Sequence, residues 1–165
     1  MKNKKKRRNS EELVTRGSLA ADFRSLGLQA GQTVLVHSAM SKLGWVNGGA
    51  VAVIQALMDV LTGDGTLVMP THTNGYIDLY TEMHNVWSPE MKEEIQNTMP
   101  LFDLRRTPSF RTGSVAELFR TWPDVLRSNH PRYSFAAWGK EARFVTEGHE
   151  MALSLGGVLP SCPGL

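Results

Sequence analysis

The sequence predicts an α/β fold in which helices connect parallel strands. Two short runs of consecutive apolar and β-branched residues, 33–37 and 66–69, are typical of strands covered on both faces. Between them, residues 50–61 repeat apolar side chains at helical spacing. A strand, a helix and a second strand in this order join two parallel strands by a right-handed crossover. We therefore expect a layered α/β architecture.

The first helix is expected over residues 15–26. A capping pattern at residues 9–12 allows a start there or at Thr15. Leu19, Phe23 and Leu26 then recur at spacings of four and three residues, and Gly27 ends the helix. The strand 33–37 is followed by a loop over 38–49, the helix 50–61, a turn over 62–65 and the strand 66–69.

Hydrophobic periodicity typical of helices or strands is weak between residues 70 and 110. Residues 71–75 are typical of a loop, and residues 89–99 of a short helix. A connection this long inside a compact domain is usually a binding loop or a disordered segment. Aromatic residues favour an ordered binding loop here, and they are Tyr76, Tyr80, Trp87 and Phe102.

The remaining residues predict one more helix and one more strand. Residues 114–121 are expected to be helical, opened by the capping pair Ser114 and Glu117. Residues 126–140 are polar and turn-rich first, then small and aromatic, which favours a loop leading into a buried strand. The less favoured alternative is an anion site formed by Arg127 and Lys140.

Length and composition are those of one compact domain. The chain has 165 residues, of which 41% are hydrophobic, and one cysteine, Cys162. A single cysteine allows no internal disulfide and no cysteine-rich zinc module, which fits a reducing cytoplasm. No apolar stretch approaches the ~20 residues that span a bilayer, and none follows the N-terminus as in a signal peptide. We expect a cytoplasmic protein without a membrane partner.

Charge is distributed unevenly along the chain. Residues 1–8 carry six of the 18 Lys and Arg residues, which leaves 12 basic against 16 acidic residues in the rest. A nucleic-acid-binding domain spreads its basic residues over a face or a helix, so we expect no nucleic-acid partner. Residues 1–10 are expected to form a disordered basic tail. An arm that contacts nucleic acid or anionic lipid is the alternative.

The loops after residues 33–37 and 66–69 are the expected ligand site, because ligands bind at the carboxyl ends of parallel strands. Ser38, Ser41 and Lys42 precede three glycines near a helix start, Gly44, Gly48 and Gly49, which is suitable for binding a phosphate. An ordinary turn is equally well supported. The five histidines show no metal-binding spacing, and no Gly-x-Ser-x-Gly motif is present, so we expect neither a metal nor a serine or cysteine nucleophile.

Four sequence blocks in order resemble the aminoglycoside 3-N-acetyltransferase family. They are VLVHS (34–38), LGWV (43–46) followed by GG (48–49), GTLVMPT (65–71), and RSNHP (127–131) with SFAAWG (134–139). The resemblance runs from about residue 15 to residue 156. It implies a three-layer α/β/α enzyme with a mostly parallel central sheet, incomplete in this chain. Such an enzyme transfers an acetyl group from acetyl-CoA to the 3-amino group of aminoglycoside antibiotics and confers resistance.

The resemblance also implies which residues bind the two substrates. Tyr76, Asp78 and Glu82 are expected to contact the aminoglycoside, with a solvated loop face as the alternative. The acidic body suits a polycationic substrate. Assembly as a homodimer is left open. The residues expected to bind acetyl-CoA are His37, Ser38, Ser41, Lys42, Gly44, Val46, Gly48, Gly49, Thr71, Ser134 and Phe135.

The family pattern continues through a second half that carries its general base, and this sequence does not show that half. The catalytic residues are therefore unknown. Loss of a general base lowers a rate by about 10²–10⁴, so an inactive relic that keeps part of the CoA-binding half is the alternative function. Residues 11–156 correspond to the N-terminal part of the acetyltransferase domain. Residues 157–165 depart from the family, and their codons permit a one-nucleotide frameshift after residue 156.

Overall fold

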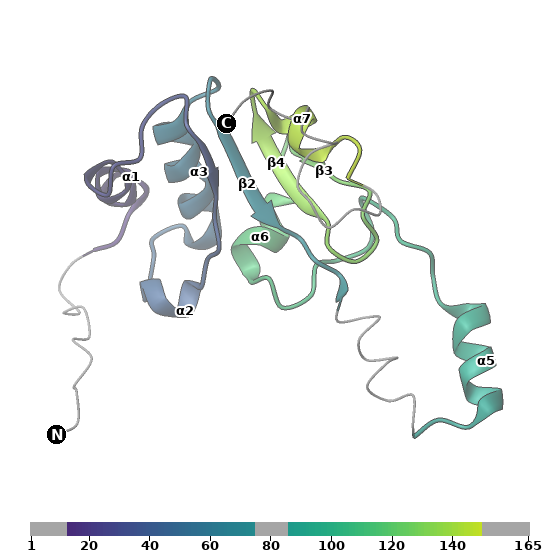
Figure 1. Ribbon diagram of the computed structural model, residues 1–165. Helices are drawn as coiled ribbons and strands as arrows, with labels where there is room; N and C mark the ends of the chain where they lie inside the picture. Colours follow the sequence, from purple (N-terminus) through teal and green to yellow (C-terminus); the bar gives the residue numbers. More distant parts are fainter. Residues whose placement is uncertain (1–12, 75–85, 150–165) are drawn as a thin grey trace, which may run out of the picture.

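The computed structural model describes residues 13–74 and 86–149, which form a four-stranded sheet with helices on both faces (Figure 1). The strand order is β1-β2-β4-β3. The strands are β1 (Thr33–Leu35), β2 (Thr66–Pro70), β3 (Leu126–Arg127) and β4 (Phe135–Gly139). The helices are α1 (Arg16–Ser25), α2 (Met40–Leu43), α3 (Gly49–Leu61), α5 (Pro89–Thr98), α6 (Ser114–Phe119) and α7 (Ala142–Thr146).

The predicted α/β class is confirmed, but the sheet is mixed rather than mostly parallel over the described residues. β1 and β2 are parallel, with Thr33 opposite Thr66, as the strand-helix-strand pattern predicted. β4 is antiparallel to both β2 and β3. Parallel neighbours need a crossover of a dozen or more residues, whereas β3 and β4 are joined by a short connection that reverses the chain direction.

β2 is the central strand, and all five of its residues are buried. Leu67 and Met69 pack into the larger core with α1, α3 and α6, whereas Val68 packs on the opposite face with Ala137 and with Val145 of α7. Side chains alternate along a strand, so helices on both faces explain a run of consecutive apolar residues. The predicted two-sided burial of this strand is confirmed.

β1 is covered on one face only in the described part of the chain. Val34 and Val36 pack against the larger core, and the Val36 N–H donates to the Val68 carbonyl at 2.9 Å, which extends the pairing beyond Leu35. Leu35 points to the other face and is 47% exposed. The prediction of two-sided burial is therefore wrong for this strand, because no described element covers that face.

α1 begins and ends close to the predicted residues. Thr15 is the N-cap, and its side chain and that of Ser18 exchange hydrogen bonds with each other's backbone N–H groups. Gly27, at φ +95°, follows the last turn. Leu19 is buried, but Leu26 is 84% exposed, so the apolar stripe ends at Phe23 and does not include the last of the three predicted residues.

α5 projects away from the sheet (Figure 1). Its start is the predicted one: Ser88 is the N-cap and accepts a hydrogen bond from the Met91 N–H, and Pro89 occupies the first turn. No residue of α5 is buried. In the described residues, no helix is long and apolar enough to cross a membrane.

Backbones meet closely where β2 begins and β4 ends. A Cβ atom added at Gly139 would lie 2.0 Å from the Gly65 carbonyl oxygen, and Gly139 has a φ of +103°. Lys140, the next residue, donates its N–H to the same carbonyl at 3.0 Å. Only glycine therefore fits at residue 139.

Candidate binding pocket at the ends of β1 and β2

A pocket of about 320 Å³ lies at the carboxyl ends of β1 and β2, where the sequence predicted a ligand site. Three segments line it: the residues after β1, the end of β2 with the loop beyond it, and the segment before α6. The lining residues are His37, Ser38, Pro70, His72, Asn74, Phe110, Arg111 and Thr112.

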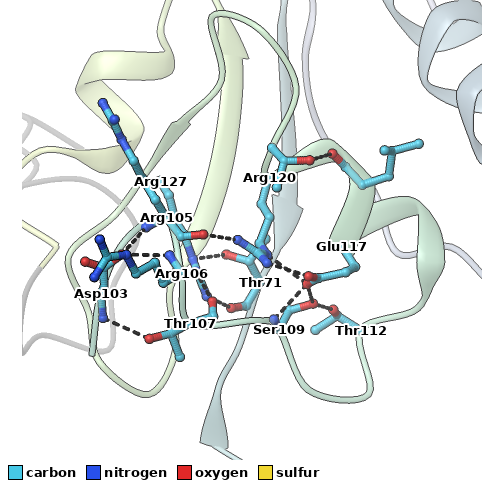
Figure 2. Close-up of polar contacts among 12 residues, drawn as sticks. Thr71, Asp103, Arg105, Arg106, Thr107, Ser109, Thr112, Glu117, Arg120 and Arg127 are labelled. Atoms are coloured by element: carbon cyan, nitrogen blue, oxygen red, sulfur yellow. Dashed lines mark hydrogen bonds and ion pairs between the residues drawn. The ribbon is translucent and has the colours of Figure 1, made fainter. Parts of the chain in front are cut away.

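The wall formed by residues 109–113 is hydrogen-bonded to the chain after β2 and to α6, and it lies close to the chain after β1. The Phe110 N–H donates to the His72 carbonyl at 2.7 Å, which joins the wall to the end of β2. A Cβ atom added at Gly113 would lie 3.2 Å from the Ser38 carbonyl oxygen, so the wall also contacts the chain after β1. Ser109 donates from its N–H and its hydroxyl to Glu117, both at 2.7 Å (Figure 2).

Glu117 does not make the capping interaction that the sequence predicted. Gly113, not Ser114, is the N-cap of α6, and no side chain caps that helix. The Glu117 carboxylate instead accepts from Ser109 and from Arg120, whose Nη2 lies 2.5 Å from Oε1. Burial acts to raise the pKa of the Glu117 carboxyl, but these hydrogen bonds outweigh it and hold the pKa at about 2.

Arg127 joins the end of β2 to the turn at residues 103–107 (Figure 2). Its Nε donates to the Thr71 and Ser134 hydroxyls at 3.2 and 3.1 Å, and its Nη2 donates to the Thr71 carbonyl at 2.8 Å. Its Nη1 donates to the carbonyls of Leu104 at 3.1 Å and Thr107 at 2.6 Å. Burial lowers the pKa of this arginine to about 10.

These contacts favour a structural role for Arg127 over the anion site that was the alternative. Its guanidinium already donates to five protein oxygens, and its Cζ lies 5.0 Å from the Phe102 ring centroid. Lys140, the second residue of that anion site, follows β4 at the opposite end of the sheet, because Gly139 pairs with the first residue of β2. The structure does not bring the two cations together.

His72 is held by rings on two sides. Its ring centroid lies 5.6 Å from that of Tyr133 and 5.1 Å from that of Phe135, both edge to face. Its Nε2 is buried and has no hydrogen-bond partner among the described residues. Burial lowers the pKa of His72, and the nearby histidines His37, His130 and His149 lower it further. These effects favour the neutral imidazole, and its buried Nε2 is a polar atom beside the pocket without a described partner.

His130 holds the turn that follows it through its imidazole. Its Nδ1 accepts hydrogen bonds from the N–H groups of Arg132 at 3.0 Å and Tyr133 at 2.9 Å. Burial lowers its pKa. In the described ranges, no group of three or more His, Cys, Asp or Glu side chains is arranged to hold a metal ion.

The structure brings only part of the predicted acetyl-CoA site together. His37 and Ser38 line the pocket. Thr71 and Ser134 are fully buried and are not among the lining residues; the Ser134 hydroxyl donates to the Thr71 carbonyl at 2.7 Å. Phe135 packs on His72. Five residues of the α2 and α3 region are not part of the lining, namely Ser41, Lys42, Gly44, Gly48 and Gly49.

Two further groups of predicted residues lie elsewhere. Val46 is 5% exposed, belongs to the larger core and pairs with Val14 through its backbone. The residues expected to contact an aminoglycoside, Tyr76, Asp78 and Glu82, lie outside the described residues.

Sequence reasoning missed most of the pocket lining. His72 and Asn74 lie in the loop after β2. The rule that ligands bind at the carboxyl ends of parallel strands applies to this loop as it does to the loop after β1, so it could have found both residues. Phe110, Arg111 and Thr112 had no such signal, because they reach the pocket from the far end of a long connection. The one nearby sequence signal is Pro108, which interrupts regular structure just before these residues.

Comparison with known proteins identifies relatives of this chain. Residues 35–160 match the family model described as aminoglycoside 3-N-acetyltransferase. An SPbeta prophage-derived aminoglycoside N(3')-acetyltransferase-like protein, YokD of Bacillus subtilis (strain 168), is 46% identical over 86% of this chain and 53% of its own length. Aminoglycoside N(3)-acetyltransferase III of Pseudomonas aeruginosa is 35% identical over 86% of this chain and 51% of its own length. The chain spans about half the length of the curated relatives it matches.

Solved structures resemble the fold over the same extent. Aminoglycoside acetyltransferase AAC(3)-Xa superposes with a TM-score of 0.75 at 34% identity, over 85% of this chain and 48% of the other. AAC-IIIb in a binary complex with CoASH superposes with a TM-score of 0.71 at 34% identity, over 84% of this chain and 50% of the other. A mutant of AAC(3)-IVa in complex with a gentamicin superposes with a TM-score of 0.65 at 26% identity, over 84% of this chain and 45% of the other.

Proposed function

Because this chain belongs to the aminoglycoside 3-N-acetyltransferase family, we propose that it takes part in transferring an acetyl group from acetyl-CoA to the 3-amino group of an aminoglycoside antibiotic. The observation that carries the proposal is the pocket at the ends of β1 and β2, lined by two residues of the first family block, His37 and Ser38. A CoASH complex of one relative and a gentamicin complex of another support the two substrate classes. The biological outcome is antibiotic resistance, exerted in the cytoplasm.

The reaction needs more than a binding pocket. The antibiotic amine is an ammonium ion at neutral pH and must lose a proton before its nitrogen attacks the thioester carbonyl. A carbon–nitrogen bond then forms, the carbon–sulfur bond breaks, and CoA leaves as a thiolate that takes up a proton. The described pocket offers hydroxyl, imidazole and guanidinium groups for positioning acetyl-CoA. We place no general base among the described residues.

The alternative is a chain that binds CoA without transferring the acetyl group, because we place no general base among the described residues. Both functions require CoA binding, and only the first requires an antibiotic. They therefore separate cleanly in two measurements on the same 165-residue protein: CoA binding by titration calorimetry, and thiol release from acetyl-CoA in the presence of gentamicin or tobramycin.

The expected result for the transferase is thiol release that requires both substrates, with a product heavier by one acetyl group in mass spectrometry. His37→Gln is expected to weaken CoA binding, whereas Lys140→Gln, at the opposite end of the sheet, serves as the control with unchanged affinity. CoA binding without thiol release supports the alternative. No CoA binding by the unaltered protein contradicts both.

A further inference from the structure

Arg111 is the one permanently charged side chain among the lining residues that the structure describes. It is exposed, and it makes no hydrogen bond or ion pair with a described residue. Its guanidinium carbon lies 5.0 Å from the centroid of the neighbouring Phe110 ring. A guanidinium that rests on an aromatic face keeps its N–H groups available to a further ligand, so the cation is oriented but not neutralised.

The backbone of Arg111 is strained, with a φ of +58°. Non-glycine residues adopt this conformation only where their surroundings impose it, and such residues cluster at ligand sites. Here the neighbours impose it. Phe110 donates its N–H to the His72 carbonyl, and the Thr112 hydroxyl donates to the Ser109 hydroxyl at 2.5 Å, which in turn donates to Glu117.

The charge of the pocket selects between the two substrates. No carboxylate is among its described lining residues, and burial lowers the pKa of His72, which favours the uncharged form of its imidazole. Among the described lining residues, the permanent charge is therefore that of Arg111. A positive site repels a polycationic aminoglycoside and attracts a phosphate, which a guanidinium binds through two parallel hydrogen bonds.

We propose that Arg111 binds a phosphate group of CoA, so that the pocket at the ends of β1 and β2 receives an anionic part of the cosubstrate and not the antibiotic. This inference rests on the proposed function, and it adds the residue and the charge that recognise CoA. The 109–113 wall, held by Glu117 and by the end of β2, sets the position of the guanidinium.

Titration calorimetry with three ligands tests the proposal. CoA carries a pyrophosphate and a 3′-phosphate, dephospho-CoA lacks the 3′-phosphate, and pantetheine lacks all phosphates. Arg111→Gln is expected to weaken CoA binding by roughly tenfold to a hundredfold, as for loss of a hydrogen bond between charged groups, and to leave pantetheine binding unchanged. The effect should shrink at high salt.

The three ligands also locate the phosphate. If Arg111→Gln weakens CoA but not dephospho-CoA, the guanidinium binds the 3′-phosphate. If both weaken equally, it binds the pyrophosphate. Arg106→Gln, in the same connection and exposed, is the matched control and should bind all three ligands as the unaltered protein does.

A second variant separates binding from folding. Arg111→Gly relieves the positive φ, so it is expected to raise the Tm while weakening CoA binding as Arg111→Gln does. Unaltered CoA affinity in both variants overturns the proposal and leaves the proposed function standing, and so does an equal loss of affinity for CoA and pantetheine. No CoA binding by the unaltered protein overturns both.

Discussion

The Glu117 carboxylate holds the pocket wall, and Glu117→Gln tests how strongly. Glutamine keeps the shape of the side chain but removes the charge and replaces one acceptor oxygen by a donor. The Arg120 side chain, which is 7% exposed, is then left without its carboxylate. Ser109 also loses the charged acceptor of its N–H and its hydroxyl. We expect the fold to be destabilised and the wall to be loosened.

The pKa of Glu117 sets the size of the effect. A carboxyl whose pKa is about 2 in the folded protein, instead of the ordinary 4.5, gains at most about 3.4 kcal/mol from its ionised form, at 1.36 kcal/mol for each pH unit. The Glu117 side chain is 38% exposed, so solvent screening reduces this value. We therefore expect Glu117→Gln to lower the free energy of unfolding by about 2 kcal/mol at pH 7.

The pH dependence follows from the direction of the shift. Because the folded pKa is depressed, the stabilisation is fully present above the unfolded pKa of 4.5 and is lost as the pH falls toward the folded value of about 2. The difference in stability between the unaltered protein and Glu117→Gln should thus be constant from pH 7 to pH 5. It should then shrink between pH 4.5 and the lowest accessible pH.

Urea unfolding followed by circular dichroism at pH 7, 5 and 3 measures these differences. Glu147→Gln is the control, because the ion pair of Glu147 with Arg143 has side chains 66% and 77% exposed and should contribute less than about 0.5 kcal/mol. A Glu117→Gln difference that is the same at pH 3 as at pH 7, or no larger than that of the control, would refute the reasoning.

Three further changes test other parts of the fold. Phe119→Ala removes a ring that is 0% exposed, so thermal unfolding should show a loss of about 3–5 kcal/mol. Gly139→Ala places a Cβ against the Gly65 carbonyl at a positive φ, so circular dichroism should show a largely unfolded chain at 37 °C. Arg127→Met removes the donors to the Leu104 and Thr107 carbonyls, so amide exchange at residues 103–107 should accelerate while exchange in α3 changes less.

Local sequence patterns were sufficient to predict the elements in which the apolar positions are also the buried ones. α3 follows directly from apolar residues at helical spacing, and β2 from consecutive apolar residues after Gly65; both are buried as expected. The direction of β4 was not predictable in this way, because it depends on contacts between segments far apart in the sequence. The exposure of Leu35 was not predictable for the same reason. The strand was predicted correctly, but whether another element covers Leu35 depends on distant parts of the chain, and no described element does.

In the candidate site too, some residues could be predicted from local sequence patterns, and others are placed by contacts between distant segments. The ends of β1 and β2 were predicted because a topological rule places ligands there, and His37 and Ser38 do line the pocket. The capping pair was wrong because Ser109 and Arg120 offer Glu117 more donors than a helix start does. The position of Arg111 depends on a backbone conformation that no residue pattern signals.

The lack of buried residues in α5 has a consequence for how such a chain can diverge. None of its residues is buried, so substitutions along this helix leave the packing of the sheet and both cores unchanged. Surface substitutions of this kind usually change the free energy of unfolding by less than about 0.5 kcal/mol. Substitutions that change the surface of this helix therefore carry little risk to folding. Substitutions in the 109–113 wall carry more, because Glu117 and Ser109 hold that wall by hydrogen bonds.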